Sequence, residues 1–353
     1  MGGLRVTGGR VLVDGALREG DVLLEDGAIA ALGSGAGRVF DARGLLVLPG
    51  IVDIHGDAFE RQVQPRPGID FPIGLALAET ERQLLANGIT TALHGITLSW
   101  EPGLRGAEMW RALLDALAAG EWRCDMRVHL LAFNDHTPAI LSRLGDPAKA
   151  SKYSDRGPLD LAAFRVLAER VGARGAEVVP ARLRLAAAAR AAGVPMASHD
   201  DDSIACRDGF RAIGARICEF PMAEDVGAAA RAAGDAVVMG SPNVVRGRSH
   251  LGWASAARLA EAGVCSVLSS DYFYPCLTQA PFVLARRGVL GLAAAWALVS
   301  ANPAAAAGLA DRGTIAVGKR ADLTVVAEEA GLARVVATIT RGRLVYLDSS
   351  DRL

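Results

Sequence analysis

The stretch Val52-Asp53-Ile54-His55-Gly56-Asp57 joins the end of a buried strand to two groups that can bind a metal ion. It closes the apolar run 45–54, which is long enough for one strand of a sheet. Because side chains alternate along a strand with a period of two, His55 and Asp57 lie on one face. A His-x-Asp pair is also typical of a polar strand end closed by a turn. Its place after an apolar strand favours a ligand pair.

Between residues 45 and 310, short apolar runs alternate with helical stretches rich in alanine, leucine, glutamate and arginine. This pattern is typical of parallel strands joined by helical crossovers. We expect strands at 45–54, 89–94, 128–133, 194–198, 216–220, 236–239 and 265–269. We expect helices at 75–87, 106–119, 159–173, 180–192, 223–233, 253–262, 289–300 and 303–309. Polar residues repeatedly follow the strands, so the sequence predicts an α/β fold with a TIM-like (β/α) barrel.

Both ends of the chain have a different pattern from the middle. Residues 4–48 alternate with a period of two and contain frequent glycines, and the same pattern returns after residue 312. We therefore expect 1–48 and 311–353 to form one small β-sandwich domain, beside a barrel made by 49–310.

Charge and cysteine content exclude several classes of protein. The 353 residues carry a formal net charge of −1, so the composition provides no general attraction to nucleic acid or to an anionic membrane. The five cysteines are odd in number and never have Cys-x-x-Cys spacing, which indicates reduced thiols. The sequence shows no signal-peptide pattern and no apolar span of about 18 residues. We expect a cytoplasmic protein with no nucleic-acid or membrane partner.

Two further strand ends supply candidate metal ligands. The run 194–198 ends in His199, before three aspartates, and we expect Asp202 or Ser203 to cap the next helix. The last apolar run is followed by Asp271. An aspartate at a strand end can bind a metal ion and accept a proton from water. We predict that His55, Asp57, His199 and Asp271 bind divalent metal and that Asp271 is the catalytic base.

Other polar residues near strand ends are weaker candidates. His136 follows the third apolar run and is a candidate metal ligand, whereas Asp135 either binds the metal or orients His136. His94 ends a strand. His129 lies inside a predicted strand, where a hydrogen-bonded core histidine is the more common case.

Taken together, these strand ends resemble the amidohydrolase superfamily. Its barrels carry His-x-His or His-x-Asp after the first strand, a histidine after the fifth and an aspartate after the eighth. Flanking segments agree with the resemblance, which covers nearly the whole chain: 48–53, 302–304 and 313–323.

Closer motifs resemble the PhnM-like family of α-D-ribose 1-methylphosphonate 5-triphosphate diphosphatases. The similar stretches are 55–61, 65–72, 87–91, 134–138, 197–201, 219–221, 240–250 and 269–272. The resemblance implies a metal-dependent hydrolase of phosphonate catabolism that releases pyrophosphate and leaves a 5-phosphate. One or two divalent ions are expected; Mg²⁺ or Mn²⁺ suits phosphates, and imidazole ligands permit Zn²⁺. Glu219 either replaces a histidine found at its place in many amidohydrolases or pairs with an arginine.

A small phosphorylated sugar needs cationic and polar residues around the metal site. Five candidates lie in loop-like stretches near the strand ends: Arg66, Asn243, Arg246, His250 and Lys152. Asn243, Arg246 and His250 share one loop, where backbone amides also face phosphate oxygens. Arg66 stands between two prolines, and a solvated turn explains it equally well. Whether the protein forms a homo-oligomer is left open.

Two other functions fit parts of the pattern. One is an amidohydrolase or deaminase that attacks a cyclic amide or an aminopurine, although the arginine-rich loop argues against a neutral amide. The other is a catalytically impaired protein that binds a phosphate ligand. Metal analysis separates the impaired binder from the enzymes.

The chain departs from the family in one respect. The pattern gives seven strands where a barrel needs eight, because only three residues, 131–133, separate two motifs between which relatives have a further strand and helix. A βα unit needs roughly 20 residues or more. We therefore expect one βα unit to be missing and 128–133 to serve as one strand, with either a gap or a distorted seven-stranded wall beside Asp135.

Overall fold

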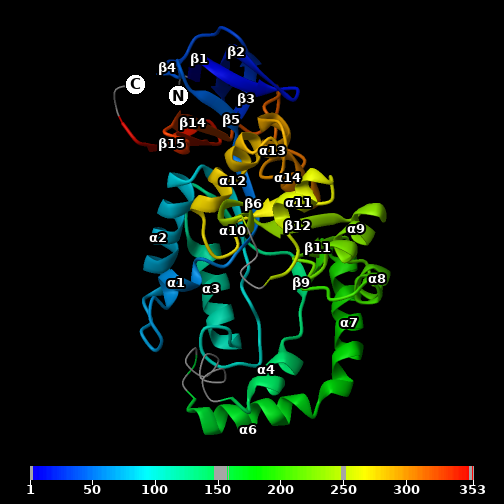
Figure 1. The fold of residues 1–353 in the computed structure, drawn as a ribbon. Helices are drawn as coiled ribbons and strands as arrows, with labels where there is room; N and C mark the ends of the chain where they lie inside the picture. Colours follow the sequence, from blue (N-terminus) through cyan, green and yellow to red (C-terminus); the bar gives the residue numbers. More distant parts are fainter. Residues whose placement is uncertain (1–2, 147–156, 158, 248–251, 350–351, 353) are drawn as a thin grey trace.

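A computed structural model describes residues 3–146, 157, 159–247, 252–349 and 352. A sheet made from both ends of the chain lies at one end of the molecule, parallel strands with their helices lie in the middle, and helices α4, α6 and α7 lie at the far end (Figure 1). Within these ranges, no helix is long and apolar enough to cross a membrane.

The sheet at the chain ends has eight strands in the order β16-β15-β14-β5-β1-β2-β3, with β4 paired to β1. Where we expected a sandwich, hydrogen bonds connect all eight strands into one sheet around its own apolar core. Its strands are β1 (Leu4–Val13), β2 (Ala16–Glu25), β3 (Ala28–Leu32), β4 (Arg38–Asp41), β5 (Leu46–Pro49), β14 (Leu323–Glu329), β15 (Leu332–Thr340) and β16 (Arg343–Leu347).

Two-residue turns set the register of this sheet. Asp14-Gly15 joins β1 to β2 and Asp26-Gly27 joins β2 to β3, with φ of 50° and 75° in the first turn and 48° and 81° in the second. Positive φ at both central residues gives the turn whose twist matches antiparallel strands. The Asp-Gly pairs in the sequence therefore account for the two hairpins.

The middle of the chain supplies eight short parallel strands in two sheets, β6-β7-β8 and β13-β12-β11-β10-β9. The strands are β6 (Ile51–Gly56), β7 (Ile89–His94), β8 (Asp125–Val128), β9 (Leu131–Phe133), β10 (Met196–His199), β11 (Ile217–Glu219), β12 (Ala236–Gly240) and β13 (Val267–Ser269). The first and last strands meet at their carboxyl ends. There, Asp271 N donates to His55 O at 3.0 Å and Asp57 N donates to Asp271 O at 3.0 Å.

The wall is interrupted between β8 and β9. Only His129 and Leu130 separate these strands, so no helix lies between them. The first half of 125–133 pairs with β7 and the second half pairs with β10. The expected count of seven strands is therefore wrong, because this one extended segment is divided into two strands that belong to different sheets. The expected absence of a helical crossover at this point is confirmed.

Thirteen α-helices and one 3₁₀ turn (Gly175–Glu177) are present in the described residues. The helices are α1 (Glu60–Val63), α2 (Ile73–Ala86), α3 (Ala107–Ala119), α4 (Thr137–Arg143), α6 (Leu161–Gly172), α7 (Val178–Ala191), α8 (Ile204–Ala212), α9 (Glu224–Ala232), α10 (Ser241–Arg246), α11 (Ala256–Glu261), α12 (Pro275–Arg286), α13 (Leu292–Ala297) and α14 (Ala301–Ala306). We did not expect α12, because Pro281 lies inside it and interior prolines usually break a helix.

Helix α2 shows how local sequence positions the barrel against the sheet. It buries Ala76, Leu77 and Leu84 on one face, a spacing typical of an amphipathic helix. Gly88 then turns the chain into β7 with φ of +74°, and a Cβ there would lie 2.3 Å from the side chain of Thr324. Since Thr324 Oγ1 also donates to Gly88 O at 2.7 Å, this turn fastens the barrel to the sheet at the chain ends.

Candidate active site

A cavity of about 1030 Å³ lies at the carboxyl ends of the barrel strands. Its lining includes all four residues expected to hold the metal, His55, Asp57, His199 and Asp271. They come from the ends of β6, β10 and β13, which are far apart in the sequence. The place agrees with the general position of active sites in barrel enzymes.

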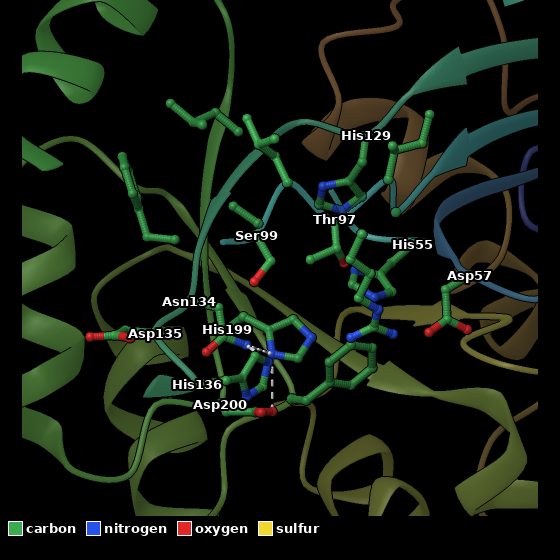
Figure 2. Close-up of a pocket in the computed structure, with 18 of the residues that line it drawn as sticks. His55, Asp57, Thr97, Ser99, His129, Asn134, Asp135, His136, His199 and Asp200 are labelled. Atoms are coloured by element: carbon green, nitrogen blue, oxygen red, sulfur yellow. Dashed lines mark hydrogen bonds and ion pairs between the residues drawn. The ribbon is translucent and has the colours of Figure 1, made fainter. Parts of the chain in front are cut away.

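The tightest group of possible ligands differs from the expected set. Atoms of His55, His199 and Glu219 that can bind a metal ion lie within 4.8 Å of one another. Figure 2 shows Asp57 to one side of the histidines. Two imidazoles and a carboxylate form a mixed nitrogen and oxygen donor set, which fits a divalent ion such as Zn²⁺ or Mn²⁺. Glu219 thus joins the candidate ligands.

Glu219 ends β11 and is fully buried between two histidines. Its carboxylate oxygens lie 3.2 Å from His55 Nδ1 and 2.9 Å from His129 Nε2. Although burial opposes ionisation, these histidines hold the pKa of Glu219 far below its ordinary range. Of the two roles left open, pairing with an arginine is not observed among the described residues.

His129 is a functional candidate that sequence reasoning placed in the core. It lies in the two-residue link between β8 and β9, lines the cavity and packs edge-on against His55, with ring centroids 4.8 Å apart. Its Nδ1 lies 2.7 Å from Leu130 O. Only the division of 125–133 between two sheets brings this histidine to the site, and no local sequence signal indicates that division.

His199 belongs to a second polar group. Its Nδ1 lies 3.1 Å from Asp200 Oδ1 and 3.0 Å from Asn134 Nδ2, and the same amide lies 2.9 Å from His136 Nε2 (Figure 2). Burial lowers the pKa of His199, but nearby carboxylates, Asp200 foremost and then Glu219 and Asp271, outweigh it and the net shift is upward. His136 lines the cavity as expected. Asp135 accepts from Thr137 N at 3.0 Å, so its observed contact is at the start of α4.

The carboxyl groups of Asp57 and Asp271 have raised pKa values. Burial and the nearby charge of Asp57 raise the pKa of Asp271 to about 7. Burial and the charge of Glu60 raise the pKa of Asp57 to about 6. A carboxyl group that titrates near neutral pH is suited to exchange protons with substrate or water.

The backbone at three strand ends is strained. Asp200, Phe220 and Asp271 have φ of 58°, 51° and 55°, in the left-handed region that residues other than glycine rarely occupy. Each such residue costs roughly 1–3 kcal/mol, and strain of this kind concentrates at functional sites. At the last strand, Ser270 donates from N at 3.1 Å and from Oγ at 2.5 Å to buried Asp53, which fixes the residue before Asp271.

The structure divides the expected substrate-binding residues. Arg246 and Asn243 line the cavity. Arg246 Nη1 donates to Tyr272 Oη at 3.4 Å, whereas the amide of Asn243 donates to Ala254 O at 3.0 Å and braces its own loop. Arg66 is exposed on a tight turn and is not among the lining residues. His250 and Lys152 lie outside the described residues.

Sequence reasoning missed Arg105. It lines the cavity and forms a two-point ion pair with Glu60, in which its Nε and Nη2 each donate at 3.0 Å. Glu60 begins α1 after the first barrel strand, and Arg105 precedes α3 after the second. The pair therefore joins two loops of the site, and nothing in the sequence around Arg105 indicated this contact.

Comparisons with known proteins agree with this architecture. Residues 182–345 match the amidohydrolase family model. Among solved structures, an amidohydrolase from an environmental sample of the Sargasso Sea is 18% identical, with a TM-score of 0.66 over 98% of this chain and 93% of that one. The dihydropyrimidinase of Brevibacillus agri is 14% identical, with a TM-score of 0.63 over 98% and 95%. These structures establish the fold.

The sequence of one relative matches that of this chain almost from end to end. The α-D-ribose 1-methylphosphonate 5-triphosphate diphosphatase of Escherichia coli K12 is 30% identical over an alignment that covers 90% of this chain and 93% of the relative. The chain therefore belongs to the amidohydrolase family and, within it, to the branch that includes this E. coli diphosphatase.

Proposed function

We propose that this protein hydrolyses the 5-triphosphate of α-D-ribose 1-methylphosphonate 5-triphosphate to the 5-phosphate and pyrophosphate, in phosphonate catabolism. The observation that carries the proposal is the 30% identity over nearly the full length of both chains to the E. coli diphosphatase. The cavity supports it, because candidate metal ligands and an arginine line the same space.

The donor atoms present fit a divalent metal ion. His55, His199 and Glu219 supply the closest group, and Asp57, His136 and Asp271 line the same cavity. A divalent ion bound there supplies positive charge that polarises the phosphoric anhydride.

Asp271 is the proposed proton acceptor. Its pKa of about 7 leaves a substantial fraction of the carboxylate ionised at neutral pH, when it can take the proton of the attacking water. Asp53 and Ser270 hold its backbone, and its main-chain bonds to His55 and Asp57 fix it against the first strand. Arg246, which lines the same cavity, binds phosphate oxygens.

The test is product analysis with metal-reconstituted protein. Protein treated with a chelator and then supplied separately with Zn²⁺, Mn²⁺ or Mg²⁺ is incubated with the ribosyl triphosphate and with nucleoside triphosphates. We expect pyrophosphate and the 5-phosphate from the ribosyl substrate, and loss of product on chelation. Asp271→Asn serves as the inactive control.

The other outcomes separate the competing functions. Orthophosphate as the sole inorganic product would reject the proposed site of cleavage. Ammonia release from an aminopurine, or opening of a cyclic amide, would favour an amidohydrolase reaction. Tight binding of the triphosphate without turnover in any metal form would favour a catalytically impaired binder.

A further inference from the structure

Tyr272 lines the cavity and lies between two arginines, one inside the cavity lining and one beside it. Arg246 Nη1 donates to its hydroxyl at 3.4 Å, and the guanidinium of Arg61 lies over its ring, 5.9 Å from the centroid. Tyr272 and Arg246 both line the cavity. A tyrosine ring accepts a cation on its face while its hydroxyl bonds at the edge, so one side chain organises both charges.

Neither of these two arginines has an acidic side chain as an ion-pair partner among the described residues. Arg105, in the same cavity, uses two nitrogens to bind Glu60 at 3.0 Å. Arg61 and Arg246 are exposed and make no ion pair within the described residues. Two exposed cations without an ion pair, one of them in the cavity lining, attract an anionic ligand.

The position of the three residues also fits a phosphate site. Arg61 is in α1 after the first barrel strand, Arg246 ends α10 after the seventh, and Tyr272 follows the eighth. In TIM barrels, the loops after strands seven and eight frequently bind phosphate. Tyr272 is adjacent to Asp271, and a Cβ on Gly240, just before α10, would lie 3.0 Å from Asp271 Oδ2. Tyr272, which contacts both arginines, therefore directly follows the proposed base in the chain.

We propose that Arg61, Arg246 and Tyr272 form the subsite for the leaving pyrophosphate. This assignment rests on the proposed function for its chemistry, but the binding it describes does not depend on turnover. Arg246 and Arg61 bind the two terminal phosphates, and Tyr272 positions both guanidinium groups.

Hydrolysis at this subsite forms one bond to phosphorus and breaks another. A water oxygen forms a bond to the phosphorus nearest the ribose, and the bond from that phosphorus to the oxygen bridging to the second phosphate breaks. The electron pair of the broken bond stays on the bridging oxygen, so negative charge develops on pyrophosphate as it leaves. The water proton goes to the Asp271 carboxylate. Arginines beside the departing oxygen stabilise this charge more in the transition state than in the bound substrate.

The direct experiment measures binding of inorganic pyrophosphate to metal-free protein by titration calorimetry at fixed ionic strength. We expect Arg246→Met to raise the dissociation constant roughly tenfold, and Arg61→Met and Tyr272→Phe roughly threefold each. Arg18→Met is the matched control, because Arg18 is an exposed arginine on β2, far from the cavity in sequence and fold. It should leave pyrophosphate binding unchanged.

The results separate this inference from the proposed function. If pyrophosphate binding weakens in both arginine variants but the ribosyl triphosphate is not hydrolysed, the subsite stands and the proposed function fails. If the ribosyl triphosphate is hydrolysed while both variants bind pyrophosphate as the wild type does, the function stands and the subsite is rejected. A loss confined to Arg246→Met would also overturn the proposal, because Arg61 would then lie outside the subsite.

Discussion

Two carboxylates at opposite ends of the barrel wall have opposite environments. Asp125 begins β8, and Arg312, Arg320 and Arg127 donate to it at 2.6, 2.7 and 2.9 Å. Although burial opposes ionisation, these hydrogen bonds hold its pKa well below the ordinary range. Asp271, after β13, has no arginine or lysine partner in the described residues, and burial raises its pKa to about 7. Both groups are largely shielded from water, so the difference comes from their partners.

The contrast indicates that Asp125 serves the stability of the barrel wall, whereas Asp271 is suited to proton transfer. The arginines around Asp125 join the barrel to the segment that leads into β14, since Arg312 also donates to Thr91 Oγ1 at 2.8 Å. A carboxylate that accepts hydrogen bonds from several arginines stays ionised near neutral pH and does not exchange protons there. The carboxylate of Asp271 has no arginine or lysine partner among the described residues. This is unfavourable for folding but suits a proton acceptor.

The largest expected effect is on turnover in Asp271→Asn. The change removes the proton acceptor and one candidate ligand while keeping the size of the side chain, so kcat/KM should fall at least ~10²-fold. The rate is measured with the proposed substrate at saturating metal, and the melting temperature serves as the control for folding. Wild-type turnover in this variant would remove Asp271 from the reaction.

The same change from aspartate to asparagine at residue 125 should lower stability and preserve turnover. Asp125→Asn leaves three arginines without their shared carboxylate, and breaking a buried ion pair typically costs 3–5 kcal/mol. Because Arg312 and Arg320 also contact Asp311 and Asp322, we expect the free energy of unfolding to fall by about 2 kcal/mol, with turnover preserved. Urea denaturation measures this, with exposed Glu19→Gln as control. Unchanged stability would contradict the structural role of Asp125.

Glu219→Gln tests the carboxylate between the two histidines. Whether Glu219 binds the metal itself or orients His55, the change should weaken divalent-metal binding about tenfold, because partners of metal ligands typically contribute 10–100-fold. Titration of chelator-treated protein with Zn²⁺ or Mn²⁺ measures the affinity. Glu224→Gln, at a salt bridge on the surface of α9, is the control. Equal affinity in the wild type and Glu219→Gln would place the metal elsewhere.

The smallest expected effect is a pH dependence of stability in the absence of metal. The folded-state pKa values of Asp57 and Asp271, about 6 and about 7, exceed the ordinary value of 3.8. The folded state therefore binds more protons between about pH 4 and 7, and the stability that these groups contribute is lost as pH rises through that range. With chelator present, the melting temperature of the wild type should fall between pH 5 and pH 8. This fall should be a few degrees larger than that of the double variant Asp57→Asn/Asp271→Asn. Parallel curves would refute the raised pKa values.

The sequence was sufficient to locate much of the candidate site because strand ends carry a strong signal. Short apolar runs that end in polar residues indicated these strand ends, and the structure places His55, Asp57, His199 and Asp271 in the lining of one cavity. The roles of these residues stay predictions. Glu219 and His129 could not be paired from sequence, because their contact requires 125–133 to pass from one sheet to another. Arg105 was missed because its partner lies in a different loop, 45 residues away.

The fold was predictable where patterns are local and less so where packing overrides propensity. Alternating residues and frequent glycines indicated that the two chain ends form β-structure together, although we expected a sandwich and the strands form one sheet. Helix α12 was missed because Pro281 opposes helix formation on its own, whereas its neighbours Ala280 and Phe282 are buried in the main core and hold the helix in place. The two-strand division of 125–133 likewise depends on which sheets flank it.

The arrangement of β5 has a consequence for how the chain folds during synthesis. Strand β5 pairs with β1 on one side and with β14 on the other, although β14 is made only after more than two hundred and fifty further residues. Until then, the edge of β5 carries unpaired backbone groups beside Val47 and Leu48, which are fully buried in the finished protein. Open apolar edges recruit other strands, and such distant pairings form slowly. The emerging chain therefore exposes this apolar edge until β14 has been made.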